Sequence, residues 1–415
     1  MNTADTYSQF VLPTYGRFQL VPERAEGVYL WDNEGKRYLD FCTGIATCSV
    51  GHCHPAVTKA IQDQAATLVH CSNLYQIPQQ AELAKLLVEK FVGTPGKVFF
   101  GNSGAEANDG MIKTARRYGH ARPNANGEAR YEIITFDKSF HGRTLGSMSA
   151  TAQEKIQVGF TPLLAGFRYV PFNDSSALAD AIGEHTVGIM FEPVQGEGGV
   201  NVADESFITT ISQLADKHDL LLLLDEVQAG LGRCGTKMGY QAVSTSLKPD
   251  IVSWAKGLGG GIPIGAFWVS DRSIDDDGTT LSSLMGPGSH GSTYGGNPLV
   301  SAGALAVLKE ILQLEENIHA REKQIRETIA SWNHPLITEV RGKGLLLGIG
   351  LVSEKFNLKE GQMAGLKLCA ALMDAGMLTV PAGPDTLRLL PPLNVTEQEI
   401  DDALTILKTV LDSNL

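Results

Sequence analysis

Cysteine is scarce in this chain, with six residues among 415 at irregular positions. Such a set is too small and too scattered for a disulfide framework in a chain of this length, so a reducing compartment is expected. Long apolar runs are also missing, since the longest run of leucine, residues 220–224, is far too short to cross a bilayer. The first residues show no positively charged segment followed by an apolar one, so no signal peptide is predicted. We therefore expect a cytoplasmic protein without a membrane partner.

Positive charge is in short supply as well. Lys and Arg number 34 against 46 Asp and Glu, which gives a formal net charge of -12 at pH 7. A field of this sign repels nucleic acid, so no nucleic-acid partner is predicted, and an anionic ligand needs local positive groups.

Metal ligands are equally sparse. His52, Cys53 and His54 stand together, but no second cluster with usable spacing follows, so we predict no metal site and interpret them as a turn before a helix near Pro55.

The chain does contain an alternation of short apolar runs and amphipathic segments. Runs typical of strands buried on both faces begin near residues 97, 131, 187, 220, 250 and 264. Between two of them, Phe207, Ile211 and Leu214 recur at helical spacing and share one face. This alternation predicts a mainly parallel sheet covered by helices. From residue 298 a long helical pattern, short strands and a last helix with a capping box at Thr396 and Glu399 predict an α+β unit.

Three of the predicted strands are followed by residues suited to chemistry, at the edge where open α/β sheets bind ligands. Ser103 and Gly104 open a helix, whose first amides attract anions such as phosphate. Asp225 follows five leucines, where a carboxylate is costly to bury without a cation or ligand. Lys256 lies between an apolar run and glycines, a setting that favours imine chemistry. Each has an ordinary structural explanation, but together they match pyridoxal 5'-phosphate, which needs a phosphate anchor, an acid for its ring nitrogen and a lysine.

Six segments in this order resemble the class III (ω-amino acid) aminotransferases of the type I pyridoxal-phosphate fold: "FFGNSGAEAND", "SFHGRT", "FEPVQGEGG", "LLDEVQAGLGRCG", "SWAKGLGGGIPIGA" and "HGSTYGGNPL". The resemblance spans residues 15–392 and is strongest to the bacterial acetylornithine aminotransferases. It implies an α/β fold with a mainly parallel seven-stranded sheet in a large domain and a smaller α+β domain built from both chain ends. The implied division is an N-terminal segment at 1–50 that contributes to the small domain and active site, a large cofactor-binding domain at 51–297, and a C-terminal small domain at 298–415.

The resemblance also implies how the cofactor is held. Lys256 would bind it covalently and move the proton between substrate carbon and cofactor, and Asp225 would keep the pyridine nitrogen protonated. The other implied cofactor-binding positions are Ser103, Gly104 and Ala105 at the phosphate, Phe140 and Val227 on the two ring faces, Gln228 near the ring hydroxyl, and Thr293, which would complete the neighbouring site in a homodimer. His141, beside Phe140, receives at most a positioning role.

Substrate recognition is implied at Tyr15, Ile45, Arg143, Glu197 and Arg388. Arg143, helped by Tyr15, would hold the far carboxylate of the substrate, and Arg388 would hold the α-carboxylate of glutamate, because the guanidinium fork suits a carboxylate. An ω-amine has no carboxylate beside the reacting carbon, so Glu197 would then pair with Arg388. Ornithine aminotransferases carry tyrosine at the position of Ile45, which argues against free ornithine as the donor.

These implications predict an aminotransferase for small amino and 2-oxo acids. It would move the δ-amino group of N2-acetyl-L-ornithine to 2-oxoglutarate, giving N-acetylglutamate 5-semialdehyde and L-glutamate, a step of arginine biosynthesis. N-succinylornithine, 4-aminobutyrate, ornithine and acyl-lysine compounds stay open as alternative donors. A lyase or aminomutase on the same fold is disfavoured by the presence of both Glu197 and Arg388, and a binding protein by Lys256 and Asp225.

Overall fold

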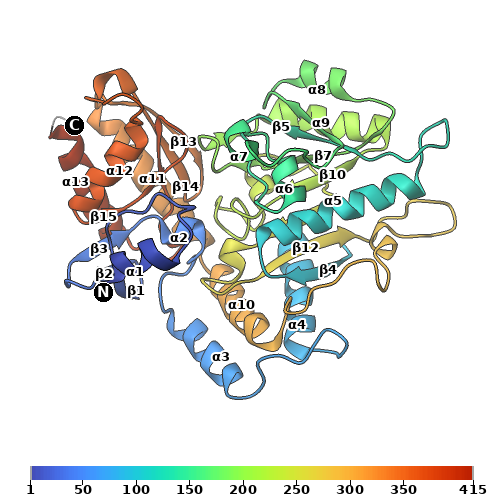
Figure 1. Ribbon diagram of the computed structural model, residues 1–415, viewed down its shortest axis with the longest axis horizontal. Coiled ribbons are helices and arrows are strands. Elements are labelled where there is room, and N and C mark those ends of the chain that lie inside the picture. Colours follow the sequence, from blue (N-terminus) through green and yellow to red (C-terminus); the bar gives the residue numbers. More distant parts are fainter. Residues whose placement is uncertain (1, 414–415) are drawn as a thin grey trace.

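The computed structural model describes residues 2–413 of the chain. Figure 1 shows two regions side by side along the long axis. The middle of the chain, green to yellow, forms the larger one, and both chain ends, blue and red, come together in the smaller one. The strand Arg37–Asp40 near the N-terminus pairs in parallel with the strand Met377–Leu378 near the C-terminus, so the two ends share one sheet.

The larger region is built on a seven-stranded sheet with the order β4-β12-β11-β10-β7-β5-β6. Its strands are β4 (Gly96–Gly101), β5 (Glu132–Phe136), β6 (Phe167–Val170), β7 (Thr186–Phe191), β10 (Leu221–Asp225), β11 (Ile251–Trp254) and β12 (Gly265–Ser270). Strand β12 is antiparallel to β4 and β11, and the other pairs are parallel. The predicted mainly parallel seven-stranded sheet is confirmed. Every residue of β7, β10, β11 and β12 is buried, as expected of apolar strands covered on both faces.

Helices cover this sheet in Figure 1. They are α5 (Gly104–Ala121), α6 (Leu145–Ala150), α7 (Glu154–Gln157), α8 (Ser175–Ala181) and α9 (Glu205–His218). In α9, Phe207 and Ile211 are buried, as their spacing predicts. Below the sheet, α10 (Pro298–Ile311) packs against α3 (Pro55–Ala65) and α4 (Pro78–Leu86), which continues as a π-helical turn (Leu87–Val92). The predicted helix start at Pro55 is therefore confirmed.

The smaller region contains two four-stranded sheets. One joins β1 (Pro22–Glu26), β2 (Tyr29–Asp32), β3 (Arg37–Asp40) and β15 (Met377–Leu378); the other joins β13 (Ile337–Lys343), β14 (Leu346–Leu351), β17 (Thr386–Leu389) and β16 (Val380–Pro381). The helices here are α1 (Thr3–Phe10), α2 (Thr43–Ala46), α11 (Glu315–Trp332), α12 (Ala364–Asp374) and α13 (Glu397–Asp412). The predicted α+β unit is confirmed, and α13 begins with the predicted capping box, in which Thr396 Oγ1 accepts the Glu399 amide at 3.3 Å.

Two details were not evident from the sequence. The helical pattern that begins at residue 298 is split between α10 and α11, because the chain turns at Leu312 and Leu314, which pack against the core. A short hairpin of β8 (Val194–Gln195) and β9 (Asn201–Val202) carries the loop that contains Glu197. Within residues 2–413 there are also four 3-10 turns, at Gly239–Ala242, Lys256–Leu258, Leu281–Leu284 and Ser353–Lys355.

No helix within residues 2–413 is long and apolar enough to span a membrane. The same part of the chain holds no group of three or more His, Cys, Asp or Glu side chains placed to bind a metal ion. His52 instead lies 2.8 Å from Asp40, with Nε2 facing Oδ2. The division of the chain at residues 50 and 297 stays a prediction.

Candidate active site

A cavity of about 460 Å³ opens beyond the ends of β4, β10 and β11. The three strand-end positions singled out in the sequence, Ser103, Asp225 and Lys256, all line it. Six further predicted positions line it with them: Gly104, Ala105, Phe140, Arg143, Val227 and Gln228. Ligands of open α/β sheets bind at this kind of edge, so its location agrees with the sequence argument.

The first amides of α5 form one wall of the cavity. Ser103 is the N-cap residue of α5, and its Oγ accepts the Glu106 amide at 3.2 Å. The amides at the start of a helix have no partner within the helix, and the helix dipole adds partial positive charge there. A Cβ at Gly104 would lie 2.9 Å from a methyl carbon of Val227, so glycine lets the two walls approach each other. This wall can hold a phosphate group.

Asp225 lies at the base of the cavity and is only 3% exposed. Its Oδ2 accepts a hydrogen bond from Asn108 Nδ2 at 2.7 Å and lies 2.8 Å from His141 Nδ1. Its Oδ1 accepts the Val227 amide at 3.0 Å. Three groups from separate elements therefore stabilise one buried carboxylate and fix its orientation, and Oδ1 keeps room to accept a further N–H.

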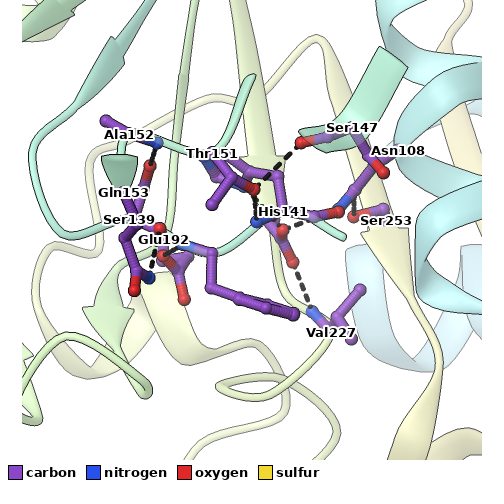
Figure 2. A network of polar contacts seen from close by, with 12 residues as sticks. Asn108, Ser139, His141, Ser147, Thr151, Ala152, Gln153, Glu192, Val227 and Ser253 are labelled. Carbon is purple, nitrogen blue, oxygen red and sulfur yellow. Dashed lines mark hydrogen bonds and ion pairs between the residues drawn. The ribbon is translucent and has the colours of Figure 1, made fainter. Parts of the chain in front are cut away.

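Residues around Asp225 are fixed in turn, as Figure 2 shows for the labelled His141, Asn108, Ser253 and Thr151. Ser253 Oγ donates to Asn108 Oδ1 at 2.6 Å, which sets the orientation of that amide. The His141 amide donates to Thr151 Oγ1 at 2.8 Å. His141 is buried, and its Nε2 has no hydrogen-bond partner among the described residues. This placement suits the positioning role expected for His141.

The turn of Ser139 and Phe140 is anchored from two sides. Gln153 Nε2 donates to the Ser139 carbonyl at 2.8 Å, and Ser139 Oγ accepts the Ala152 amide at 3.1 Å. The Phe140 amide donates to Glu192 Oε2 at 3.0 Å. The guanidinium of Arg143 lies 5.6 Å from the centre of the Phe140 ring.

Lys256 also lines the cavity, and one residue, Ala255, separates it from the end of β11. Its φ of 39° is unusual for a residue with a side chain and occurs where the chain leaves the strand for a 3-10 turn. Burial lowers the pKa of the Lys256 amine, and the charge of Glu197 opposes this effect without cancelling it. An amine with a lowered pKa has a larger neutral fraction, which nucleophilic attack and proton transfer require.

Arg388, fully buried on β17, meets Glu197 beside the cavity. Its Nη1 donates to Glu197 Oε1 at 2.6 Å and to Gln228 Oε1 at 2.7 Å. Gln228 Nε2 also lies 3.3 Å from Glu197 Oε1. Burial alone would raise the pKa of Glu197, but the charges of Arg388 and Lys256 and the hydrogen bonds from Arg388 and Gln228 together outweigh it, and the pKa falls to about 2. The pair is therefore ionised at neutral pH, and Gln228 belongs to it.

Ile45 occupies a left-handed turn. The φ angles of Thr43, Gly44, Ile45 and Ala46 all lie between 49° and 65°. Such a turn costs roughly 1–2 kcal/mol for each residue with a side chain. The surroundings compensate, since Thr43 Oγ1 donates to the Leu390 carbonyl at 2.8 Å and the Thr43 amide to Asp40 Oδ1 at 2.8 Å. Ile45 lines a second cavity, of about 830 Å³, between this turn and the N-terminal segment.

Five predicted positions are not among the residues that line the first cavity: Tyr15, Ile45, Glu197, Thr293 and Arg388. Tyr15 is 75% exposed and is not among the residues that line this cavity, whereas Arg143 is. Thr293 is exposed as well, in the loop before α10. In the described part of a single chain, Tyr15 and Thr293 therefore do not line the first cavity.

The sequence argument missed Asn108, Ser253 and Glu192. Glu192 follows β7 directly, as Asp225 ends β10, so the strand-end criterion could have found it. Asn108 is an asparagine inside a helix, where asparagine is unfavourable, which is a weaker signal. Ser253 lies within β11 and gives no signal in the sequence.

Comparison with known proteins agrees with this architecture. The fold is that of the type I pyridoxal-phosphate aminotransferases: an ornithine aminotransferase from Toxoplasma gondii superimposes with a TM-score of 0.89 at 28% identity, covering 99% of this chain and 94% of that one. The N-acetylornithine aminotransferase from Stenotrophomonas maltophilia gives a TM-score of 0.79 at 34% identity, covering 96% and 97%.

The chain belongs to the class III aminotransferases, whose family model matches residues 11–411. It is 44% identical over 411 residues to the acetylornithine aminotransferase of Caldanaerobacter subterraneus, covering 98% of each protein. It is 43% identical over 420 residues to the acetylornithine aminotransferase of Synechocystis, covering 99% of this chain and 93% of that protein. The protein is thus an aminotransferase, and the expected family is confirmed.

Proposed function

We propose that this protein transfers the δ-amino group of N2-acetyl-L-ornithine to 2-oxoglutarate with pyridoxal 5'-phosphate as cofactor, in the biosynthesis of arginine. The observation that carries the proposal is the ion pair of Arg388 and Glu197 beside Lys256. This pair suits a site that must accept two substrates with different charges in turn. The similarity to acetylornithine aminotransferases along nearly the whole chain supports the choice of donor.

The residues of the cavity fit this cofactor. The α5 amides offer a phosphate site, Asp225 has an oxygen able to accept a pyridinium N–H, and Lys256 offers an amine of lowered pKa. When bound, the cofactor supplies an aldehyde for the amino group and a ring that stores the electron pair left on the substrate carbon. Phe140 and Val227 line the cavity and would bound the two faces of that ring.

The other steps belong to side chains of the protein. Lys256 Nζ, in its neutral form, would take the proton from the substrate carbon and hold it beside the cofactor site. Asp225, fixed by Asn108, His141 and Val227, keeps a negative charge at the ring nitrogen. Arg143 holds the far carboxylate of acetylornithine, and Tyr15 assists once it is brought to the site.

Arg388 acts in the second half of the reaction. While acetylornithine is bound, Glu197 neutralises Arg388 and no charge is left unpaired beside the reacting carbon. When 2-oxoglutarate enters, its α-carboxylate replaces Glu197 on the guanidinium. Because one carboxylate replaces another, the buried Arg388 cation keeps a hydrogen-bonded counter-charge, and the free-energy cost of the exchange stays small.

We also propose a homodimer in which Thr293 of one subunit completes the phosphate site of the other. Large apolar side chains are exposed on one chain, among them Phe10, Leu12, Leu74 and Tyr294 at 71%, 77%, 89% and 62%. The segments of Leu74 and Tyr294 lie together, since Asn73 Nδ2 donates to the Gly295 carbonyl at 2.9 Å, and neighbouring exposed apolar side chains are typical of an interaction surface. Sedimentation of the active enzyme tests this, and an active monomer would contradict it.

A panel of amino donors tests the proposed substrate. Each donor is given with 2-oxoglutarate, and glutamate is measured: N2-acetylornithine, N-succinylornithine, ornithine, 4-aminobutyrate and an acyl-lysine. We expect the highest kcat/KM with N2-acetylornithine. A higher value with any other donor would replace it as the substrate, and turnover without glutamate would indicate a lyase or aminomutase.

A further inference from the structure

Glu192 is an acidic residue of the cavity to which no role has been given above. It follows β7, lines the cavity with Asp225 and Lys256, and is only 5% exposed. Its Oε2 accepts the Phe140 amide at 3.0 Å. Its Oε1 has no hydrogen-bond partner among residues 2–413, and Figure 2 shows Glu192 on the opposite side of His141 from Ser253. A polar oxygen of a nearly buried side chain therefore faces the space for the ligand.

Glu192 forms no ion pair with a Lys, Arg or His within the described residues. The ionisable groups that face it are Asp225 from β10, Lys256 after β11 and Glu197 from the β8–β9 loop. Asp225 has three hydrogen-bond donors and Glu197 has an arginine, whereas Glu192 has one backbone amide. When two carboxyl groups lie close together in a buried site, the one with fewer donors keeps its proton.

Electrostatics point the same way. Burial, and next the negative charge of Asp225, raise the pKa of Glu192 well above its ordinary value. The Phe140 amide and the charge of Lys256 oppose this rise and are outweighed. A second full negative charge next to Asp225 would also repel the phosphate and dicarboxylate ligands that the proposed function requires.

We propose that Glu192 is a neutral carboxylic acid in the working enzyme, with Oε2 accepting the Phe140 amide and the O–H on Oε1 donating a hydrogen bond to a negatively charged oxygen of the ligand in the cavity. The inference rests on the proposed cofactor site and assigns the cavity a donor besides Lys256, Arg143 and the α5 amides. It does not depend on which amine is the substrate.

The protonation state is tested by infrared difference spectroscopy of the loaded enzyme against Glu192→Gln. The carbonyl stretch of a protonated carboxyl group should be present in the wild type and missing from the variant. Glu226→Gln is the matched control, because Glu226 is another buried glutamate, whose pKa burial raises to about 7. Above that pH the band should persist in Glu226→Gln. A wild-type spectrum without the band, or a band lost only in Glu226→Gln, would overturn the proposal.

The donor role is tested by cofactor binding and by titration of the visible absorption of the bound cofactor. Glu192→Gln keeps a neutral donor, so its Kd for the cofactor and its absorbance midpoint should match the wild type. Glu192→Met keeps the length but not the donor, and its Kd should rise by about tenfold to a hundredfold. If the absorbance midpoint were lower in Glu192→Gln than in the wild type, the substitution would have removed a negative charge, and Glu192 would not be neutral. If the Kd for the cofactor rose equally in both variants, Glu192 would not donate a hydrogen bond to the ligand. Circular dichroism establishes that both variants fold, and neither measurement uses an amino donor.

Discussion

The two sides of the cavity are built differently. At the base, Asp225 is held by Asn108, His141 and Val227, which come from α5, the loop after β5 and the loop after β10. At the other side, Arg388 on β17 and Glu197 in the β8–β9 loop form one ion pair, and Gln228 lies within hydrogen-bond distance of both. A carboxylate with three donors cannot move without leaving buried groups unpaired, whereas a loop glutamate can leave its partner when another carboxylate arrives. The comparison suggests a fixed charge for the cofactor and an exchangeable one for the substrates.

Asp225→Asn removes the fixed charge and should have the largest effect. We expect kcat to fall by about 10² to 10³-fold in both half-reactions, because a preorganised charge is lost from both. Stopped-flow absorbance with acetylornithine, and separately with 2-oxoglutarate, measures the two rates. If only one half-reaction slowed, Asp225 would be a substrate residue instead.

Arg388→Leu removes the cation that Glu197 and the α-carboxylate of 2-oxoglutarate would bind in turn. The reaction with 2-oxoglutarate should weaken by about a hundredfold in kcat/KM, as expected when one partner of a buried charge pair is lost. The reaction with acetylornithine should change far less, since Glu197 occupies Arg388 at that stage. Single-turnover kinetics of both halves give the comparison, and equal losses would contradict the proposed exchange.

Glu197→Gln tests the same difference between the two half-reactions by changing the partner of Arg388. Arg388 is then left without a counter-charge when the ω-amine binds, so KM for acetylornithine should rise by about tenfold, the value of one charged hydrogen bond. KM for 2-oxoglutarate should fall or stay the same, because its carboxylate no longer competes with Glu197. Steady-state kinetics with each substrate varied in turn would reveal the opposite pattern if Glu197 bound the donor directly.

Ser253→Ala tests how firmly Asn108 and Asp225 are held at the base of the cavity, and it should have the smallest effect. Its hydroxyl orients Asn108, so its loss should lower kcat by about fivefold, in line with roughly 1 kcal/mol for a neutral hydrogen bond. Ser175→Ala, which loses a hydroxyl contact with Thr210 on the outer helices, is the matched control and should leave kcat unchanged. Equal rates in the two variants would show that Asn108 needs no such support.

The strand-end positions could be found from the sequence because parallel strands bring their carboxyl ends to one edge. Ser103, Asp225 and Lys256 each follow an apolar run, and the structure brings them to one cavity. Glu192 met the same criterion and was overlooked. Asn108 and Ser253 could not be found in this way, because a helix interior and a strand interior give no sign of what lies across the space between them. The hydrogen bond between Arg388 and Gln228 was likewise not evident from the sequence, and the place of Gln228 near the ring hydroxyl stays a prediction.

The sequence by itself determined the class of fold, the family and the order of the chemical groups, because these follow from the period of apolar residues and from short motifs read along the chain. Only the tertiary structure decided which groups share a proton, a charge or a hydrogen bond. Asn108 and Asp225 are 117 residues apart in the chain, and His141 and Asp225 are 84 apart. The strength of such pairs depends on distance and burial, which arise only when the sheets and helices pack together.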